Sequence, residues 1–505
     1  MQNKWKTTSL EELGVQLIDC DHKTPKAVED GVPYIGIPQM DNGRINFEAK
    51  PRLISEEDFK TWTRKADPKF GDVILSRRCT SGETVYVPKN AKFALGQNLV
   101  LLRPTGERLH PEYLRWAVQG TEWWDEVNKY LNPGAIFESL KCRDIPKFKI
   151  PEPPKWQQIK ICEQLSAISD KIELNRQTNQ TLESMAQTLF KSWFVDFDPV
   201  FDNLLAKADF KIENLESTLP EGLVKTAKIR LLALNGLAEA DKTKASLKAL
   251  AQGSTPLSPT ILMQHATTHA HFPSEFEHNE QLGWIPKGWE SQPFGDLLEN
   301  TIGGDWGKEL PDEKHTIKSC IVRGTDIPPL KNGSKSKAPV RWVEEKKFKT
   351  REIKFADIII EVSGGSPTQP TGRSVFMSEG IIKRLGGIIE PASFCRKFRP
   401  LNEKIGLLAS VHLQKIYDEG KTWEYQNQST GISNFQTKHF LEKEIVLIPK
   451  EEVLSKFYDI VINFINRKDL EQSERLTKLR DTLLPKLISG ELQIPDVITS
   501  NEKTA

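Results

Sequence analysis

The second half of the sequence repeats, in the same order, the motifs of the first half. Phe70–Ser76 has the pattern of a short β-strand that begins with Gly-Asp, and Phe355–Glu361 repeats it with Ala-Asp. Asp72 and Asp357 occupy the same place in the two copies. An ordered internal repeat predicts two similar domains. The length of 505 residues, too great for one ordinary hydrophobic core, agrees with this.

Each of these runs is followed by a polar loop that contains glycine, and then by a second short β-type run. In the first half the loop is Arg77–Gly82 and the second run is Val85–Val87. In the second half the corresponding segments are Ser363–Gln369 and Ser374–Phe376. Two such runs around a short loop are typical of a β-hairpin, so both domains are expected to carry a hairpin with a polar tip.

A second pair of matched segments closes each domain. In the first half, Pro133–Phe137 is followed by Ile145–Pro151. In the second half, Thr430–Ser433 is followed by Glu444–Pro449. Each pair leads directly into a long helical pattern, so the predicted order is domain, helix, linker, domain, helix.

Both helical patterns place apolar residues at the alternating spacings of three and four that characterise a coiled-coil seam. The seam of the first helix is apolar at Leu165, Ile168, Ile172, Leu182, Ala186 and Leu189, and polar at Asn175 and Asn179. The seam of the second is apolar at Phe457, Val461, Phe464, Leu476, Leu479 and Leu483, and polar at Lys468 and Gln472. Polar seam residues favour the register in which they meet, so antiparallel pairing is expected. The alternative is two amphipathic helices that each pack on their own domain.

These patterns predict a mixed α+β protein with two similar domains, two long paired helices and pseudo-two-fold symmetry. The predicted segments are 1–152 (first domain), 153–200 (first helix), 201–280 (linker or helical insertion), 281–450 (second domain), 451–492 (second helix) and 493–505 (flexible tail). A helix from Lys155 to about Trp193 would be on the order of 55 to 60 Å long, and would act as a spacer of definite length.

The composition is that of a globular protein without a membrane span. Apolar residues make up 38% and charged residues 28% of the chain, and no run approaches the roughly 20 apolar residues that a membrane helix needs. The formal net charge is only +1, so any positive surface for nucleic acid must be local or shared with partner subunits. The six cysteines are scattered singly, which favours a reducing cytosol, and a cytoplasmic location is expected.

Four histidines gather in one polar stretch, at His265, His269, His271 and His278. A zinc site would combine them with cysteine or carboxylate ligands, and no such set accompanies them in the sequence. A polar linker is the preferred interpretation, and neither a metal nor a cofactor is expected.

The sequence offers little for independent catalysis. The dipeptides that could begin a methyltransferase motif lack the second proline, and no Walker-type phosphate loop is present. Asp312, Glu352 and Lys354 fit a loose nuclease pattern, but a chain this rich in charge produces that pattern by chance.

Several stretches resemble the specificity (S) subunit of type I restriction-modification systems. The most specific is Leu182–Pro199, which looks like the end of the family's first conserved helical region. Gln281–Trp289 is similar to the usual start of its second recognition domain, and Leu479–Glu491 to the end of its second conserved helix. Gly71–Ser76 and Gln97–Leu102 also fall where the family places them.

The resemblance implies a subunit that reads DNA and catalyses nothing by itself. Each of two target recognition domains would read one half of a split DNA target for adenine methylation, and the paired helices would fix the unread gap. The implied partners are double-stranded DNA, two methylation subunits that grip the helices, and motor and nuclease subunits for restriction. Asn203–Phe272 is longer than the family pattern and would be a helical insertion. The alternatives are a coiled-coil scaffold and a nuclease or methyltransferase component.

Candidate DNA contacts lie mainly in the polar hairpin loops, because Arg, Gln, Asn and hydroxyl side chains can hydrogen bond to base edges. In the first domain they are Arg77, Arg78, Thr80, Ser81, Gln97 and Asn98. In the second they are Ser363, Ser366, Thr368, Gln369 and Arg373, with Lys331, Lys335 and Lys337 as candidate phosphate contacts. The alternatives are a turn role for Gln97 and Asn98, and a solvated loop for the lysines.

Overall fold

The computed structural model describes residues 5–41, 43–47, 49–132, 138–234, 269–333, 336–364, 369–429, 432–467 and 470–495. The chain separates into two compact units. Unit 1 comprises residues 1–173 and 475–505, and unit 2 comprises residues 174–474. Both units mix helices and sheets, as the sequence predicted. Among the described residues no helix is long and apolar enough to cross a membrane.

Unit 1 contains an antiparallel sheet of four strands, in the order β2 (Val15–Asp19), β10 (Leu99–Pro104), β7 (Val73–Ser76) and β8 (Thr84–Tyr86). A smaller sheet has the order β6 (Arg52–Ile54), β3 (Val32–Ile35) and β9 (Ala94–Leu95), with β9 parallel to β3. Two further pairs are β1 (Thr7–Ser9) with β11 (Lys149–Pro151), and β4 (Met40–Asp41) with β5 (Arg44–Ile45).

Unit 2 repeats this arrangement of sheets. Its four-stranded sheet has the order β15 (Leu298–Gly303), β22 (Cys395–Pro400), β18 (Ile358–Glu361) and β20 (Ser374–Phe376). Its smaller sheet has the order β17 (Val340–Glu344), β16 (His315–Val322) and β21 (Ile389–Pro391), with β21 parallel to β16. β14 (Glu290–Pro293) pairs with β25 (Ile445–Ile448), as β1 pairs with β11.

Two further sheets are present in unit 2. One is the hairpin of β12 (Phe276–Asn279) and β13 (Gly283–Pro286). The other has the order β19 (Ser363–Gly364), β24 (Ile432–Phe435) and β23 (Gln426–Ser429).

Short helices cover the sheets of each unit. In unit 1 they are η1 (Ile37–Gln39), α1 (Glu56–Thr63), α2 (Leu114–Ala117), α3 (Thr121–Tyr130) and η2 (Ile145–Lys147). In unit 2 they are η4 (Phe294–Leu297), η5 (Gly324–Asp326), α10 (Ile327–Asn332), α11 (Glu345–Arg351), α12 (Glu379–Arg384), α13 (Glu403–Asp418), η6 (Lys421–Tyr425) and α14 (Thr437–Lys443).

The matched strands β7 and β18 are buried on both faces because their alternate side chains enter two different cores. Val73 and Leu75 of β7 lie in one core of unit 1, and Ile74 lies in another. Ile358 and Ile359 of β18 are divided between two cores of unit 2 in the same way. This double burial explains why both runs are almost wholly apolar instead of alternating.

The repeated aspartate forms the same buried ion pair in both units. Asp72 accepts hydrogen bonds from Arg103 Nε at 2.8 Å and Nη2 at 2.6 Å. Asp357 accepts the corresponding bonds from Arg399 at 2.9 and 2.7 Å. Both aspartates are 1% exposed, so each strand that they precede is fixed to its neighbour by a charge-assisted pair. The sequence repeat is thus a structural repeat.

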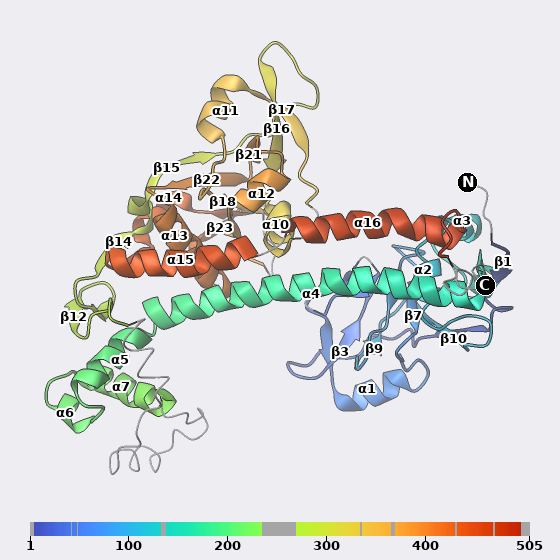
Figure 1. The fold of residues 1–505 in the computed structure, drawn as a ribbon, viewed down its shortest axis with the longest axis horizontal. Coiled ribbons are helices and arrows are strands. Elements are labelled where there is room, and N and C mark those ends of the chain that lie inside the picture. The colour runs from blue at the N-terminus through green and yellow to red at the C-terminus, as the bar shows by residue number, and fades with distance from the viewer. Residues whose placement is uncertain are drawn as a thin grey trace, which may run out of the picture. The chain divides into compact units, whose positions relative to one another are not determined.

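The long helical regions are α4 (Lys155–Phe194), α15 (Glu451–Arg467) and α16 (Leu470–Ser489). Figure 1 shows α4 as one continuous helix and the C-terminal region as two consecutive helices. In unit 1, Leu165 of α4 shares a core with Leu484 and Leu487 of α16. In unit 2, Phe190 of α4 shares a core with Phe457 of α15. The early part of α4 thus packs with late α16 and its later part with α15, which is the antiparallel pairing that the sequence predicted.

The polar belt of the helices is present in unit 2. Asn175 Nδ2 donates to Gln472 Oε1 at 2.8 Å and to Ser473 Oγ at 3.4 Å. Asn179 is also buried, as the seam requires, whereas Lys468 lies outside the described residues.

The predicted apolar seam needs one correction, because Leu479 is 46% exposed. Leu189 and Leu483 are half-buried and pack against the cores, beside the more deeply buried Phe190 and Leu484. Ile172, Leu182, Phe464 and Leu476 are buried or half-buried, as a seam requires.

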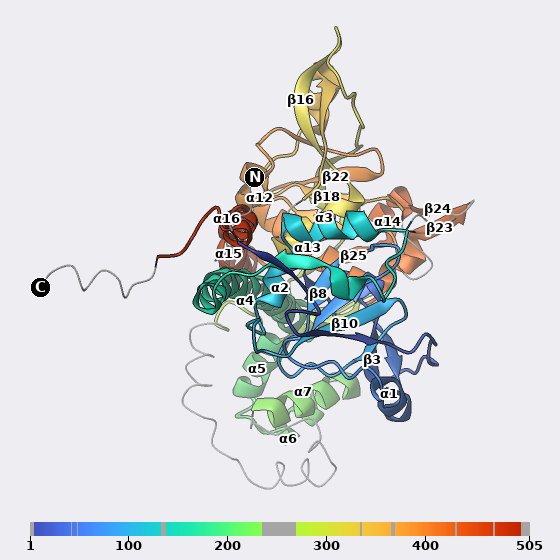
Figure 2. The ribbon, with the colours of Figure 1, turned by 90° about the vertical axis from the view of Figure 1, so that its right-hand side faces the viewer.

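The segment after α4 forms a group of helices with its own core, α5 (Asp198–Lys207), α6 (Glu213–Glu216) and α7 (Glu221–Leu234) (Figure 2). The buried Asp202 accepts two hydrogen bonds from Arg230, at 2.6 and 2.7 Å. His269 Nδ1 lies 3.5 Å from the same carboxylate, and His265 is outside the described residues. His269 therefore lies beside a structural ion pair.

Candidate nucleic-acid interface

The hairpin predicted in the first domain is present, with β7 and β8 joined by residues 77–83. The loop folds down onto α3. Trp123 Nε1 donates to the carbonyl of Gly82 at 2.8 Å, and a Cβ at Gly82 would lie 2.7 Å from Val127. Gly82 also has a φ of +98°, so only glycine allows both this turn and this close packing. The position of the loop is therefore fixed by packing.

A second segment of unit 1 pairs with this loop. Arg78 and Ser139 form an antiparallel bridge, and the amide of Leu140 donates to the carbonyl of Arg77 at 2.9 Å. Ser81 Oγ donates to the carbonyl of Glu138 at 3.1 Å. The matched segment Pro133–Phe137 lies outside the described residues, but the residues directly after it are placed beside the hairpin loop.

The candidate residues of unit 1 differ in how far they reach solvent. Arg78 is exposed, whereas the side chain of Arg77 is only 14% exposed and its Nη2 lies 3.7 Å from Asp19 Oδ1. The hydroxyl of Thr80 donates to Ser76 Oγ at 3.3 Å, and that of Ser81 is bonded to backbone carbonyls. Arg78 is thus the candidate whose side chain projects from the loop.

Gln97 and Asn98 have local structural roles. Asn98 has a φ of +68° and its carbonyl accepts from the amide of Arg77, which is the geometry of a turn before β10. Gln97 Nε2 donates to Thr24 Oγ1 at 2.9 Å.

Sequence reasoning missed a short basic segment beside the loop. Lys141 and Arg143 follow Leu140 directly, and both are exposed; the Arg143 side chain is 77% exposed. Their proximity to Arg78 depends on the pairing between residues 77–78 and 139–140. The basic residues between Lys141 and Lys149 are visible in the sequence. They are far from the hairpin loop along the chain, so the sequence does not show that the two segments lie together.

Unit 2 brings the corresponding segments together through β19 and β24. Ser363 pairs with Asn434 across the two strands, and Ser363 Oγ donates to Asn434 Oδ1 at 2.8 Å. Gln369 is exposed and hydrogen bonds to the side chain of Tyr417. Ser366 and Thr368 lie outside the described residues. Asn434 was not among the residues singled out in the sequence, although it lies next to the matched segment Thr430–Ser433.

Arg373 takes part in an internal ion pair. Its Nε and Nη2 atoms donate to the two carboxylate oxygens of Glu361 at 2.8 and 2.6 Å, and the hydrogen bonds to Glu361 raise the pKa of Arg373. The two side chains are 17% and 5% exposed. The Nε–Nη2 edge of the guanidinium is therefore occupied by Glu361, and this pair holds the base of the loop.

The candidate lysines of unit 2 differ in their exposure to solvent and in their partners. Lys331 Nζ lies 3.0 Å from Glu183 Oε1 and also hydrogen bonds to Gln414, so its charge is compensated within unit 2. Lys337 is exposed, and Lys335 lies outside the described residues. Of the two described lysines, Lys337 is therefore the better candidate for a phosphate contact, because it is exposed and the charge of Lys331 is paired with Glu183.

Both units thus present the same construction. A hairpin loop that leaves the four-stranded sheet is braced by a segment that comes from late in the same domain. Exposed hydrogen-bonding side chains are held on this pair of segments: Arg78, Lys141 and Arg143 in unit 1, and Gln369 in unit 2. Such groups can donate to base edges and to phosphate oxygens.

Comparison with known proteins shows similarity to one family. The sequence profile of the type I restriction modification DNA specificity domain matches residues 2–184. The chain is 24% identical over 439 residues to the type I restriction enzyme HindI specificity subunit of Haemophilus influenzae, which covers 84% of this chain and 87% of that protein. It is 24% identical over 485 residues to the MjaIX specificity subunit of Methanocaldococcus jannaschii, which covers 92% of this chain and 88% of that protein.

Among solved structures, the chain is similar to the S subunit of a type I restriction-modification system from M. genitalium. The identity is 14%, the TM-score is 0.44, and the alignment covers 98% of this chain and 97% of that one. The profile match covers the first domain and much of α4, and the alignments with the two sequence relatives extend over most of the chain. Over most of its length the chain is therefore similar to the specificity subunits of type I restriction-modification systems, and its first part matches their DNA specificity domain.

Proposed function

We propose that this chain supplies DNA sequence recognition to a type I restriction-modification complex. The observation that carries the proposal is the structural repeat, in which two equivalent sheets each hold a braced polar loop. Two copies of the same DNA-binding element suit a target sequence in two parts. Each domain would recognise one half of a bipartite site. The names of the sequence relatives, all specificity subunits, support the same function.

In unit 1, Arg78 is the proposed base contact, and Lys141 and Arg143 are the proposed phosphate contacts. An exposed guanidinium can bond to a guanine edge through two parallel donors, whereas lysine acts as a point charge that positions the protein. In unit 2 the proposed polar contacts are Gln369 and Asn434. Arg77 and Arg373 are left out of the contact set because Asp19 and Glu361 lie beside them.

The helices α4, α15 and α16 are the proposed attachment surface for two methylation subunits, and motor and nuclease subunits would complete the complex. The chain itself would catalyse neither methylation nor cleavage, and would act in the cytoplasm where the host DNA lies. Leu174 and Met185 of α4 are large apolar side chains that remain exposed, and both would be suitable contacts for a partner.

The function is tested by co-expression with the methylation subunit of the same system and mapping of methylated adenines in host DNA. The expected result is a split motif with a constant gap that disappears when this chain is omitted. Methylation that continues unchanged without the chain would contradict the proposal.

The contact residues are tested with the assembled methyltransferase in binding titrations. Arg78→Ala is expected to weaken binding to the cognate duplex by about 1 to 3 kcal/mol, because a bidentate base contact is lost. Arg78→Lys keeps the positive charge but cannot make the bidentate base contact. It should therefore restore only the part of the binding free energy that comes from attraction to the phosphates. Lys141→Ala should weaken binding to all sequences alike and reduce the salt dependence by about one ion.

Arg64→Ala is the matched control, since Arg64 is exposed at the end of α1 and belongs to neither segment of the interface. Equal affinity of Arg78→Ala and Arg64→Ala for the cognate duplex would remove the hairpin loop from the proposal.

A further inference from the structure

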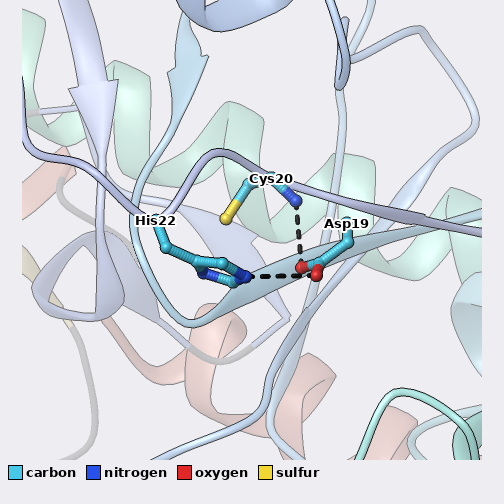
Figure 3. Close-up of side chains that lie close together, drawn as sticks. All are labelled: Asp19, Cys20 and His22. Atoms are coloured by element: carbon cyan, nitrogen blue, oxygen red, sulfur yellow. Dashed lines mark hydrogen bonds and ion pairs between the residues drawn. The ribbon is translucent and has the colours of Figure 1, made fainter.

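A carboxylate, a thiol and an imidazole lie close together where β2 ends, on Asp19, Cys20 and His22 (Figure 3). Their donor atoms are all within 4.8 Å of one another. His22 Nε2 is 3.2 Å from Asp19 Oδ2, and the Cys20 thiol donates to the carbonyl of Gly96 at 3.3 Å. The Asp19 and His22 side chains are 26% and 53% exposed, so an ion can reach the group from solvent.

A fourth donor comes from a distant part of the sequence. The Cys142 thiol hydrogen bonds to the Asp19 carboxylate. Cys142 follows the segment that pairs with the hairpin loop, and the bond from the Leu140 amide to the carbonyl of Arg77 holds that segment in place. The fold of unit 1 thus places a second thiol beside the carboxylate of the group formed by Asp19, Cys20 and His22.

We propose that Asp19, Cys20, His22 and Cys142 bind a zinc ion. Zinc takes four ligands in tetrahedral sites and accepts thiolate, imidazole and carboxylate donors at about 2.0 to 2.3 Å. Calcium and magnesium take oxygen ligands instead, so the two thiols select against them. Cys142, whose thiol contacts Asp19 but lies outside the group within 4.8 Å, would move toward Cys20 and His22 to complete the four ligands.

The charge around the cluster fits a zinc site. Two thiolates and a carboxylate around a doubly charged cation leave one negative charge in excess. Arg77 Nη2 is 3.7 Å from Asp19 Oδ1, and its buried Nε has no hydrogen-bond partner among the described residues. The guanidinium therefore balances that charge and has a donor to spare for a ligand atom. Zinc binding would release the two thiol protons to solvent.

The site would connect three segments of unit 1. These are the end of β2, the segment around Cys142 and, through Arg77, the base of the hairpin loop. Bound zinc would then stiffen the loop from which Arg78 projects. The inference concerns metal binding by unit 1 itself, so it stands or falls independently of the proposed DNA contacts.

The test uses the full-length chain, stripped of metal with a chelator and titrated with cobalt(II) alone. We expect one cobalt ion per chain and a near-ultraviolet charge-transfer band from thiolate ligands, both of which added zinc abolishes. Cys20→Ser and Cys142→Ser should each lower cobalt affinity at least about tenfold and weaken the band. Cys79→Ser is the matched control, because Cys79 is an exposed thiol of the hairpin loop outside the cluster.

Circular dichroism of the metal-free variants checks that each one folds. His22→Asn gives a second test at an exposed position and should change the visible cobalt spectrum. The proposal is overturned if no thiolate band forms, or if Cys20→Ser and Cys142→Ser bind cobalt as the parent does. A band that only Cys79→Ser removes would likewise overturn it.

Discussion

The buried Asp72–Arg103 and Asp357–Arg399 pairs show how one residue in each repeat fixes a strand. Each aspartate also accepts from a backbone amide three residues earlier, at 2.8 Å from Lys69 and 2.7 Å from Lys354. Both oxygens of each carboxylate therefore have partners, as a buried charge requires.

Removal of either carboxylate charge is expected to be costly. Asp72→Asn and Asp357→Asn should each lower the free energy of unfolding by about 3 kcal/mol, because the arginine would be left without its counter-charge in a partly buried site. Denaturant unfolding of the two variants measures this, with the exposed Asp125→Asn as the control. A loss no greater than that of the control would show that the pair is dispensable.

Glu390 is a buried carboxylate of β21 that has no such compensation. It is 0% exposed, and neither of its oxygens has a hydrogen-bond partner among the described residues. Burial raises the pKa of Glu390 from 4.5 to about 7; Arg351 and Lys347 act in the opposite direction, and Asp305 adds to the increase.

This pKa predicts a stability that depends on pH. Because the folded-state pKa is above the unfolded value, folding is favoured while Glu390 is protonated, and that stability is lost as the pH rises from about 4.5 to 7. Glu390→Gln should therefore raise the free energy of unfolding by ~3 kcal/mol at pH 8 and change it little at pH 4.

Thermal unfolding of Glu390→Gln across this pH range measures the effect, with the exposed Glu313→Gln as the control. An equal gain at pH 4 and pH 8 would mean that the glutamate is not protonated on folding.

At the scale of the elements, the turn before each of the matched strands β7 and β18 requires a left-handed backbone conformation. The two repeats place different residues at that position. Gly71 has a φ of +94°, and Ala356, in the same place, has a φ of +67°. The left-handed region costs an L residue roughly 1 to 2 kcal/mol relative to glycine. The first repeat avoids that cost with glycine, whereas the second accepts it and buries the alanine methyl in its core.

Gly71→Ala should lower the free energy of unfolding by about 1 kcal/mol, since a Cβ at this position meets no atom within 4 Å and only the backbone is strained. Gly222→Ala, in α7 and equally free of neighbours, is the control and should be neutral or stabilising. Both are measured by denaturant unfolding. A neutral Gly71→Ala would indicate that the turn tolerates alanine without strain.

The whole molecule consists of two compact units, each with its own hydrophobic cores. Calorimetry is therefore expected to show two unfolding transitions. Asp72→Asn should shift one transition and Asp357→Asn the other, because the two ion pairs lie in different units. A single transition that both variants shift equally would show that the units unfold together.

The sequence by itself determined the repeat, the hairpins and the long helices. Those features depend on the local order of residue types, and Asp72 and Asp357 can be matched from the sequence alone. The periodicity also predicted the polar belt at Asn175 and Asn179. It failed at Leu479, which is 46% exposed, because spacing along a helix does not show which positions a neighbouring element covers.

Only the tertiary structure decided which polar side chains face solvent. Arg77 and Arg78 are neighbours in the sequence, yet one points toward Asp19 and the other is exposed. Lys141 reaches the hairpin loop, and Cys142 reaches Asp19, through backbone pairing between segments far apart in the chain. Such contacts are fixed by packing and long-range hydrogen bonds, which residue order does not reveal.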